Sequence, residues 1–260
     1  MLPASLLAFD TATDHMSIAL QAGGEVWVHE GPGGAQASAS LIPAVLGLLA
    51  QANLSLRDLS AIAFGRGPGA FTGLRTACSV AQGLAFGANL PVLPIDSLCA
   101  VAEDARETPS AQETWVAMDA RMGEIYAARY AFDGLDWYTQ IAPCLLTPGA
   151  LNALWQAAPP RRVAGSALTV FADQLECADA MRSPAALPRA RAMLPLAQRL
   201  WQQGGAVDAS QALPIYVRDK VAQTTLERDH ARAVLVHGGG RGAARGAARG
   251  ARGEPAAPPS

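Results

Sequence analysis

The chain has 260 residues, of which 50% are apolar and 16% are charged, so a sizeable core can form. Residues 231–260 carry five Arg and one Glu, which leaves 15 basic and 21 acidic side chains in residues 1–230. A mildly acidic body is not typical of a surface that binds phosphate backbones unaided. No apolar run approaches the roughly 20 residues of a membrane span. The first ten residues lack the features of a signal peptide, so we expect none.

The first ninety residues predict three meandering strands and then a mixed α/β region. Alternation in 16–21 and 25–30, around the turn Gly23-Gly24, indicates a hairpin after a short strand at 6–9. Apolar periodicity then predicts helix 41–51, strand 61–64, helix 72–87, strand 91–95 and helix 97–106, with Ser97 as N-cap. This β-β-β-α-β-α-β-α order is that of the ribonuclease-H-like half of the actin and sugar-kinase (ASKHA) superfamily.

The rest of the chain predicts a second, smaller unit of the same kind. We expect strands at 115–119, 125–132, 141–145 and 162–164 and helices at 148–155 and 190–204, while 158–190 is poorly assigned. The Gly/Arg/Ala-rich end has no apolar periodicity and predicts disorder. It could contact RNA or be an extension without a function. The predicted divisions are a ribonuclease-H-like domain at 1–107, a reduced second domain at 108–209, a segment packing back at 210–232 and a disordered tail at 233–260.

The most distinctive motif is GRGPGAFTGLR at residues 65–75, between a predicted strand and a predicted helix. Its glycines allow close approach of the backbone, and Thr72 could cap the helix. The motif lacks the Gly-Lys-Ser/Thr of a P-loop, and Pro68 disrupts a dinucleotide-binding fingerprint. Anion binding at the helix start and a purely structural turn both remain open. Thr72 and Arg75 are weak candidates for anion or cofactor contact.

Two further turns carry charged residues. Asp10-Thr11-Ala12-Thr13 follows the first strand, where the superfamily places a phosphate loop, but Ala12 replaces the glycine of nucleotide-binding forms. We favour a structural role for this turn and keep Asp10 and Thr11 as weak cofactor-binding candidates. Asp119-Ala120-Arg121-Met122-Gly123-Glu124 lies in a predicted hairpin turn, where charged residues are ordinary.

The helices predicted at 41–51 and 72–87 are apolar beyond the single stripe that a sheet-covering helix needs. No charged residue lies between Thr76 and Ala88, and Ile42, Leu46 and Ala50 fall outside the main stripe of the first helix. The outer sides form a partner interface, or another part of the chain covers them. For a partner contact we select nine residues: Leu41, Ile42, Val45, Leu49, Arg75, Ala77, Ala81, Leu84 and Ala85. An Ala81→Arg substitution is expected to break the contact and leave the monomer folded.

The sequence predicts neither a catalytic constellation nor a metal site. The four cysteines form no CxxC pair, which favours a reduced, cytoplasmic protein without disulfides. The four histidines are scattered, without the spacing of metal ligands. There is no Gly-x-Ser-x-Gly nucleophile elbow.

The chain resembles the TsaB (YeaZ) family from residue 6 to about residue 229. The resemblance lies in AFDTAT at 8–13, the loop at 65–75, AQGLA at 81–85, DARMGEIY at 119–126 and PIYVRDKVA at 214–222. One departure is Gln36-Ala37-Ser38-Ala39, near which many relatives carry a histidine before the first helix. The Gly/Arg tail also lies outside the family pattern.

The resemblance implies a two-domain ASKHA fold with a reduced second domain and no active site of its own. It implies a scaffold role in forming N6-threonylcarbamoyladenosine at position 37 of ANN-decoding tRNAs. The implied partners are the catalytic paralogue TsaD, which binds through the two helices of the first domain, and the ATPase TsaE. The resemblance also allows a homodimer through the same surface without TsaD, and it implies that tRNA is reached through the complex. No tightly bound cofactor is expected; ATP or ADP is a candidate ligand at the partner interface. The alternative is a nucleotide-dependent kinase or a peptidase of the same fold.

Overall fold

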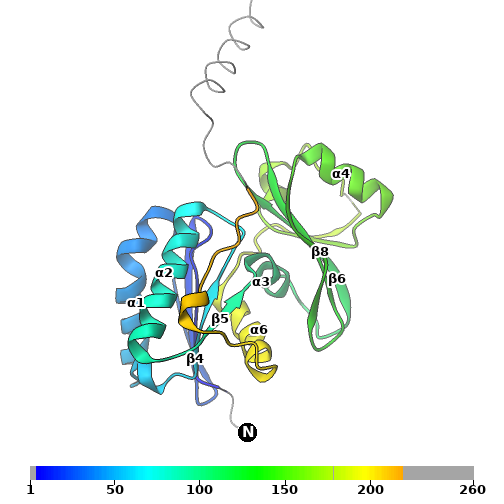
Figure 1. Cartoon of the computed structure of the whole chain (residues 1–260). Helices are drawn as coiled ribbons and strands as arrows, with labels where there is room; N and C mark the ends of the chain where they lie inside the picture. The colour runs from blue at the N-terminus through cyan, green and yellow to red at the C-terminus, as the bar shows by residue number, and fades with distance from the viewer. Residues whose placement is uncertain (1–3, 178, 219–260) are drawn as a thin grey trace, which may run out of the picture. The chain divides into compact units, whose positions relative to one another are not determined.

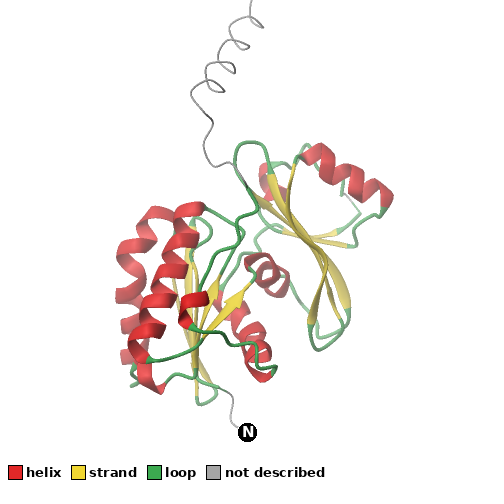
Figure 2. Ribbon diagram, viewed as in Figure 1, coloured by secondary structure: helices red, strands yellow, loops and turns green. Residues whose placement is uncertain are grey.

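The structure is a computed structural model that describes residues 4–177 and 179–218. The predicted tail at 233–260 and residues 219–232 of the segment predicted at 210–232 lie outside the described residues. Residues 1–217 form one compact unit of the chain, in which two five-stranded sheets carry the helices (Figure 2).

The first sheet has the strand order β3-β2-β1-β4-β5. The pairs β1–β2 and β2–β3 are antiparallel, whereas β1–β4 and β4–β5 are parallel. The parallel pairs are linked by helices, as such connections require. This arrangement confirms the β-β-β-α-β-α-β-α order predicted from the sequence. The strands are β1 (Leu6–Asp10), β2 (His15–Ala22), β3 (Glu25–Pro32), β4 (Ala61–Gly65) and β5 (Val92–Ile95).

The second sheet repeats this topology, with the order β10-β9-β6-β7-β8. Its three-strand meander and its two parallel strands correspond in chain order to those of the first sheet. The last residue of β1, Asp10, therefore corresponds to the last residue of β6, Asp119. The strands are β6 (Gln112–Asp119), β7 (Ile125–Phe132), β8 (Trp137–Leu146), β9 (Arg162–Ala164) and β10 (Met181–Ser183).

Side chains of β1 alternate between two cores, as the twofold period of a strand requires. Leu7 and Phe9 face a core formed with α1 (Ala37–Gln51) and α2 (Phe71–Ala88). Leu6 and Ala8 face a second core formed with α6 (Ala190–Gln202). Figure 1 shows α1 and α2 side by side on one face of this sheet and α6 beyond the other face.

The final helix of each half packs against the sheet of the other half. Helix α3 (Ser97–Asp104) follows the first sheet in the chain, yet Leu98, Val101 and Ala102 join the core of β6 and β7. Helix α6 follows the second sheet, yet it packs on β1 and β2. The expected division between 1–107 and 108–209 therefore needs correction at these two helices, because each buries its apolar face in the opposite half.

The second half is smaller because its helices are shorter. Helices α4 (Pro148–Ala157) and α5 (Ala167–Val170) cover the face of the second sheet opposite α3. The single turn of α5 takes the place that the 18-residue α2 holds in the first half. Residues 158–190 thus contain three short elements, β9, α5 and β10, of which only β9 was predicted.

Two predicted helix caps are wrong. The N-cap of α3 is Asp96, whose carboxylate accepts from the backbone N–H of Leu98 at 2.9 Å, and Ser97 is the first helical residue. Helix α2 starts at Phe71 after Ala70, without a side-chain cap, so Thr72 lies inside the first turn. The hydroxyl of Ser97 is used for a contact with β1 instead.

Candidate functional site

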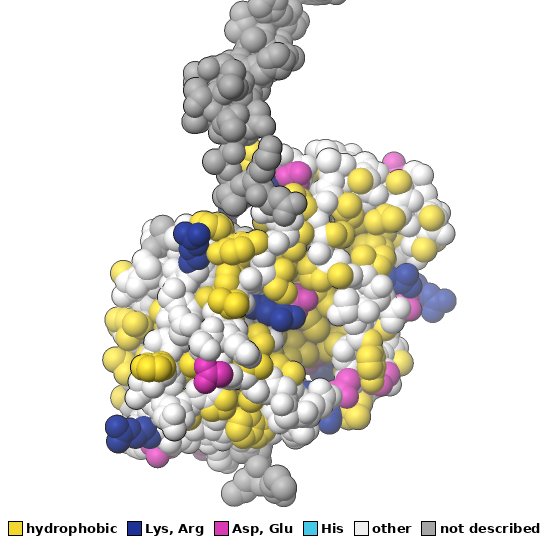
Figure 3. All heavy atoms as spheres, in the orientation of Figure 1, with side chains coloured by type: hydrophobic (Ala, Val, Ile, Leu, Met, Phe, Trp, Pro, Cys, Tyr) yellow, Lys and Arg dark blue, Asp and Glu magenta, His cyan; other side chains and the backbone are white. Residues whose placement is uncertain are grey.

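The outward face of α1 and α2 exposes large apolar side chains and carries no charge over most of its length. Phe86 is 82% exposed, Leu46 is 52% exposed and Ile42 is 41% exposed. Helix α1 has no charged residue, and Arg75, near the start of α2, is the single charge in the two helices. Figure 3 shows hydrophobic and uncharged side chains over most of this pair, at the left of the view. Large apolar side chains exposed on one pair of helices are typical of an interaction surface.

Most of the residues selected for the partner contact lie on the wrong side of their helices. Six of them are at most 3% exposed and pack on the first sheet: Leu41, Val45, Leu49, Ala77, Ala81 and Ala85. Leu84 is half-buried, while Ile42 and Arg75 are exposed. Both faces of each helix are apolar, so periodicity could not tell which one faces the sheet. The expectation that Ala81→Arg leaves the monomer folded is therefore corrected.

The exposed side chains that were missed are Leu46 and Phe86. Their signal was present in the sequence, because Leu46 lies outside the main apolar stripe of α1 and Phe86 lies in a run without charge. An apolar residue on the polar side of an amphipathic helix is the pattern that points to a contact.

Glycines of α2 leave room beside this face. A Cβ at Gly83 or Gly87 would meet no atom within 4 Å. Together with Leu84 and the 3-10 helix Leu56–Asp58, they line a hollow of about 520 Å³. Small residues beside a hollow let a partner side chain insert, which is how the anchors of protein interfaces are seated. We call the exposed face and this hollow the α1–α2 surface.

Arg75 lies at the edge of the α1–α2 surface and contacts the end of the described chain. Its guanidinium carbon lies 3.9 Å from the centre of the Phe71 ring, and its Nε donates to the Tyr216 hydroxyl at 3.3 Å. The rings of Phe71 and Tyr216 are 5.2 Å apart. The backbone N–H of Ile215 donates to the Arg66 carbonyl at 2.7 Å. Ile215 and Tyr216 thus contact the first half, while Val217 packs against the core of β6 and β7.

The glycine-rich motif packs tightly against the turn that follows β1. A Cβ at Gly65 would lie 1.8 Å from Oδ2 of Asp10, and one at Gly73 would lie 1.8 Å from the Thr11 carbonyl oxygen. The Thr11 hydroxyl donates to the Gly73 carbonyl at 2.7 Å. Glycine is needed at 73 because its backbone approaches the backbone of Thr11, and at 65 because the Asp10 and Ser97 side chains occupy the place of a Cβ. The contacts support a structural role for the motif, which was one of the two interpretations left open.

Asp10 is buried within this contact, at 1% exposure. Its carboxylate accepts from the Ser97 hydroxyl and from the Ala12 backbone N–H, both at 2.6 Å. Burial raises the pKa of Asp10 to about 6, although both hydrogen bonds act in the opposite direction. Thr11 is also fully buried, whereas Thr72 is exposed. The three weak cofactor-binding candidates Asp10, Thr11 and Thr72 therefore do not form one open site.

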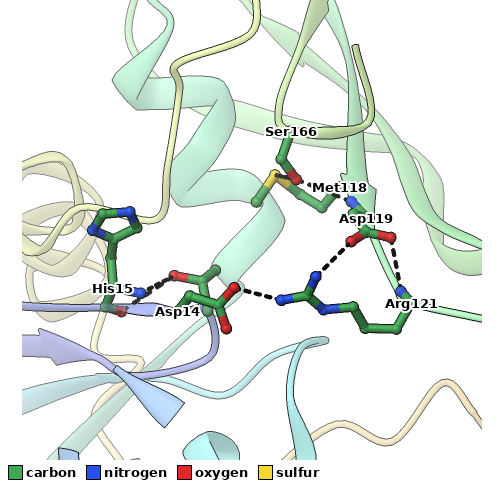
Figure 4. Close-up of polar contacts among 7 residues, drawn as sticks. Asp14, His15, Met118, Asp119, Arg121 and Ser166 are labelled. Carbon is green, nitrogen blue, oxygen red and sulfur yellow. Dashed lines mark hydrogen bonds and ion pairs between the residues drawn. The ribbon is translucent and has the colours of Figure 1, made fainter. Parts of the chain in front are cut away.

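The corresponding turn of the second half reaches the first half through Arg121 (Figure 4). Oδ1 of Asp119 accepts from the Arg121 backbone N–H at 2.8 Å, which repeats the Asp10–Ala12 contact. The Arg121 guanidinium pairs with Asp14 of the β1–β2 turn and, at 3.4 Å, with Asp119. The sequence marked 119–124 as an ordinary charged turn; the structure shows that it joins the two halves.

The four cysteines are free, and burial raises the pKa of each thiol. A raised pKa disfavours the reactive thiolate. Among residues 4–177 and 179–218, no group of three His, Cys, Asp or Glu is placed to hold a metal ion. No helix of the described chain is long and apolar enough to cross a membrane.

Comparisons with known proteins identify the family of this chain. A family model described as "TsaD: tRNA N6-adenosine threonylcarbamoyltransferase" matches residues 29–239. The chain is 34% identical to tRNA threonylcarbamoyladenosine biosynthesis protein TsaB of Escherichia coli over 84% of this chain and 96% of that protein. It is 36% identical to the protein of the same description in Haemophilus influenzae, over 84% of this chain and 94% of that protein. The solved structure of YeaZ from Pseudomonas aeruginosa superposes with a TM-score of 0.74 at 36% identity, covering 82% of this chain and 99% of that chain. The chain belongs to the TsaB (YeaZ) family, which has the α/β actin-like fold predicted from the sequence.

Proposed function

We propose that this chain is a non-catalytic subunit of the complex that forms N6-threonylcarbamoyladenosine at position 37 of ANN-decoding tRNAs. The curated relatives that cover 84% of the chain are described as tRNA threonylcarbamoyladenosine biosynthesis proteins. In this proposal the chain binds a TsaD-type transferase and holds it in its active arrangement, and the partner carries out the chemistry.

The observation that carries the proposal is the α1–α2 surface. Ile42 and Leu46 of α1 and Phe86 of α2 are exposed, and α2 also borders a hollow with Gly83, Leu84 and Gly87. Burying such side chains against a partner removes apolar area from water, worth roughly 25 cal/mol per Å². The charges of this surface are confined to Arg75 at its edge and to the 3-10 helix beside the hollow, so the partner would present a mainly apolar face. A paralogue with an equivalent pair of helices meets this requirement, and a second copy of this chain would meet it in the absence of the paralogue.

Further members of the complex belong to the same proposal. The ATPase TsaE joins the pair, tRNA contacts the assembled complex, and ATP or ADP binds at the interface between this chain and TsaD. The protein acts in the cytoplasm, where tRNA is modified.

The direct test is reconstitution. The purified chain is mixed with its cognate TsaD, TsaE, threonylcarbamoyl-adenylate and tRNA, and modified adenosine is measured with and without it. We expect modification to require the chain and the chain alone to be inactive. Equal modification without it would reject the scaffold role. Saturable ATP hydrolysis by the chain alone would instead favour the kinase-like alternative.

A further inference from the structure

A second cavity lies where the two halves meet and is separate from the α1–α2 surface. It has a volume of about 500 Å³, within the usual range for small-molecule sites, and no residue of α1 or α2 lines it. Its walls come from α3, from the β7–β8 hairpin and from α6. Figure 3 shows a hollow near the middle of the view, where hydrophobic side chains lie among basic and acidic ones. We call this cavity the α3 pocket.

The apolar part of the α3 pocket is aromatic. Phe132 and Trp137 lie with ring centres 5.1 Å apart, and Leu196 and Leu200 of α6 complete the lining. The two rings pack against each other, Phe132 is 7% exposed, and the Arg106 guanidinium carbon lies 4.8 Å from the centre of its ring. The half-buried Trp137 is therefore the ring of this pair that a planar group can contact, and aromatic contacts contribute beyond the area that they bury.

Most charged groups of the pocket already have partners. Glu103 accepts two hydrogen bonds from Arg106, at 2.6 and 2.8 Å, and one from Trp137 Nε1 at 2.8 Å. Arg199 pairs with Asp136 at 3.5 Å. These pairs leave little free charge for a ligand to neutralise.

Arg66 is the exception. Its Nε is buried without a hydrogen-bond partner among the described residues, and their ion pairs do not include its guanidinium. The carboxylate whose pKa the charge of Arg66 affects is Asp96, which accepts hydrogen bonds from the Tyr130 hydroxyl at 2.8 Å and from the Leu98 backbone N–H at 2.9 Å. Burial raises the pKa of Asp96, and the charge of Arg66 acts against that rise. A buried donor without an acceptor calls for an explanation, and a guanidinium matches a carboxylate in shape and charge.

We propose that the α3 pocket binds a small aromatic carboxylate, with the carboxylate on the Arg66 guanidinium and the ring against Trp137. The ligand supplies the ion-pair partner that the Arg66 guanidinium lacks among the described residues. A molecule of one or two fused rings fits within the cavity of about 500 Å³. The site is distinct from the proposed pairing surface, so a ligand there adds a second binding function.

The test uses the full-length chain and 2-naphthoate as the probe, measured by isothermal titration calorimetry, with the neutral 2-naphthamide as the matched ligand. Arg66→Gln removes the charge, and Arg161→Gln, at an exposed position outside the pocket, is the control. We expect the wild type to bind 2-naphthoate at least about tenfold more tightly than 2-naphthamide, and Arg66→Gln to lose that preference while Arg161→Gln keeps it.

Circular dichroism shows whether Arg66→Gln folds. If it does not, a third variant still tests the proposal. Thr139→Trp adds bulk at an exposed position of the pocket lining and is expected to weaken 2-naphthoate binding at least about tenfold. The proposal is overturned if the wild type shows no binding of 2-naphthoate below about 10 mM. It is equally overturned if a folded Arg66→Gln variant or Thr139→Trp binds the probe as well as the wild type does.

Discussion

The Ser97 hydroxyl donates to Oδ2 of Asp10 at 2.6 Å, although 87 residues separate them in the sequence. The same hydroxyl accepts from the Gly67 backbone N–H at 3.1 Å. One serine at the start of α3 therefore connects the end of β1 to the glycine-rich loop. Asp10 is 1% exposed in this contact, so its ionisation is linked to folding.

Asp10 makes stability depend on pH. Burial raises the pKa of Asp10 from 3.8 to about 6, so between about pH 4 and 6 the folded chain holds a proton that the unfolded chain has lost. The Asp10 contribution to the free energy of unfolding therefore falls as pH rises through this window, by on the order of 3 kcal/mol, and is constant above it. Urea unfolding of the wild type and Asp10→Asn at pH 4 and pH 7 checks this. The free energy of unfolding of the variant minus that of the wild type should be larger at pH 7 than at pH 4. An equal difference at the two pH values would contradict the prediction.

Two glycines of α2 should respond oppositely to alanine. A Cβ at Gly73 would lie 1.8 Å from a backbone oxygen, whereas one at Gly83 meets nothing within 4 Å. Gly73→Ala is expected to lower the free energy of unfolding by more than about 2 kcal/mol. Gly83→Ala should leave it unchanged or raise it by up to about 1 kcal/mol, because alanine favours the helix. Chemical denaturation of both variants measures the contrast, and similar values for the two would argue against the close backbone contact.

A charge introduced on the exposed side of α2 should affect pairing with TsaD, whereas a charge introduced on its buried side should affect folding. Phe86 is 82% exposed, so Phe86→Glu should change the free energy of unfolding by less than about 0.5 kcal/mol and abolish pairing with TsaD. Ala81 is fully buried, so Ala81→Arg should destabilise the monomer by several kcal/mol. Thr169→Glu, at an exposed position of α5, is the control for an added charge. Thermal unfolding and size-exclusion chromatography with TsaD measure the two effects; normal pairing by Phe86→Glu would reject the surface.

The ion pair between Asp14 and Arg121 joins the two halves but should contribute little energy. The two side chains are 76% and 68% exposed, so water and salt screen their attraction. A double-mutant cycle with Asp14→Asn and Arg121→Gln should give a coupling energy between 0 and about 1 kcal/mol that decreases with added salt. A coupling above about 2 kcal/mol would show that the contact holds the halves together more strongly than its exposure suggests.

Asn152 should stabilise the second half far more than its neighbour one turn later. Its side chain donates to the Gln174 carbonyl at 2.7 Å and accepts from the Glu176 N–H at 3.0 Å, at 8% exposure. Asn152→Ala leaves both backbone groups without partners and should cost about 2–3 kcal/mol. Gln156→Ala removes an exposed contact to Glu176 and should cost less than about 0.5 kcal/mol. Urea unfolding of both variants measures the difference, and equal costs would contradict the assignment.

The first half of the fold could be predicted because its signals are local. Strand alternation, the Gly23-Gly24 turn and helical periods lie within short windows of sequence, and β1 to α3 match the expected order. The stretch from 158 to 190 could not be predicted in the same way. Its elements α5 and β10 have four and three residues, which is too short for either period to show.

The candidate site was predicted at the level of helices but not of side chains. The sequence determined that α1 and α2 carry more apolar surface than a sheet can cover, and it identified the family through its motifs. Tertiary structure alone decided that Leu41 and Ala81 face the sheet, that α6 crosses to the first half, and that Arg66 lines a pocket with Trp137. The physical reason is that hydrophobic attraction has no direction. Local periodicity marks an apolar residue, while contacts between segments far apart in the sequence determine which apolar side is buried.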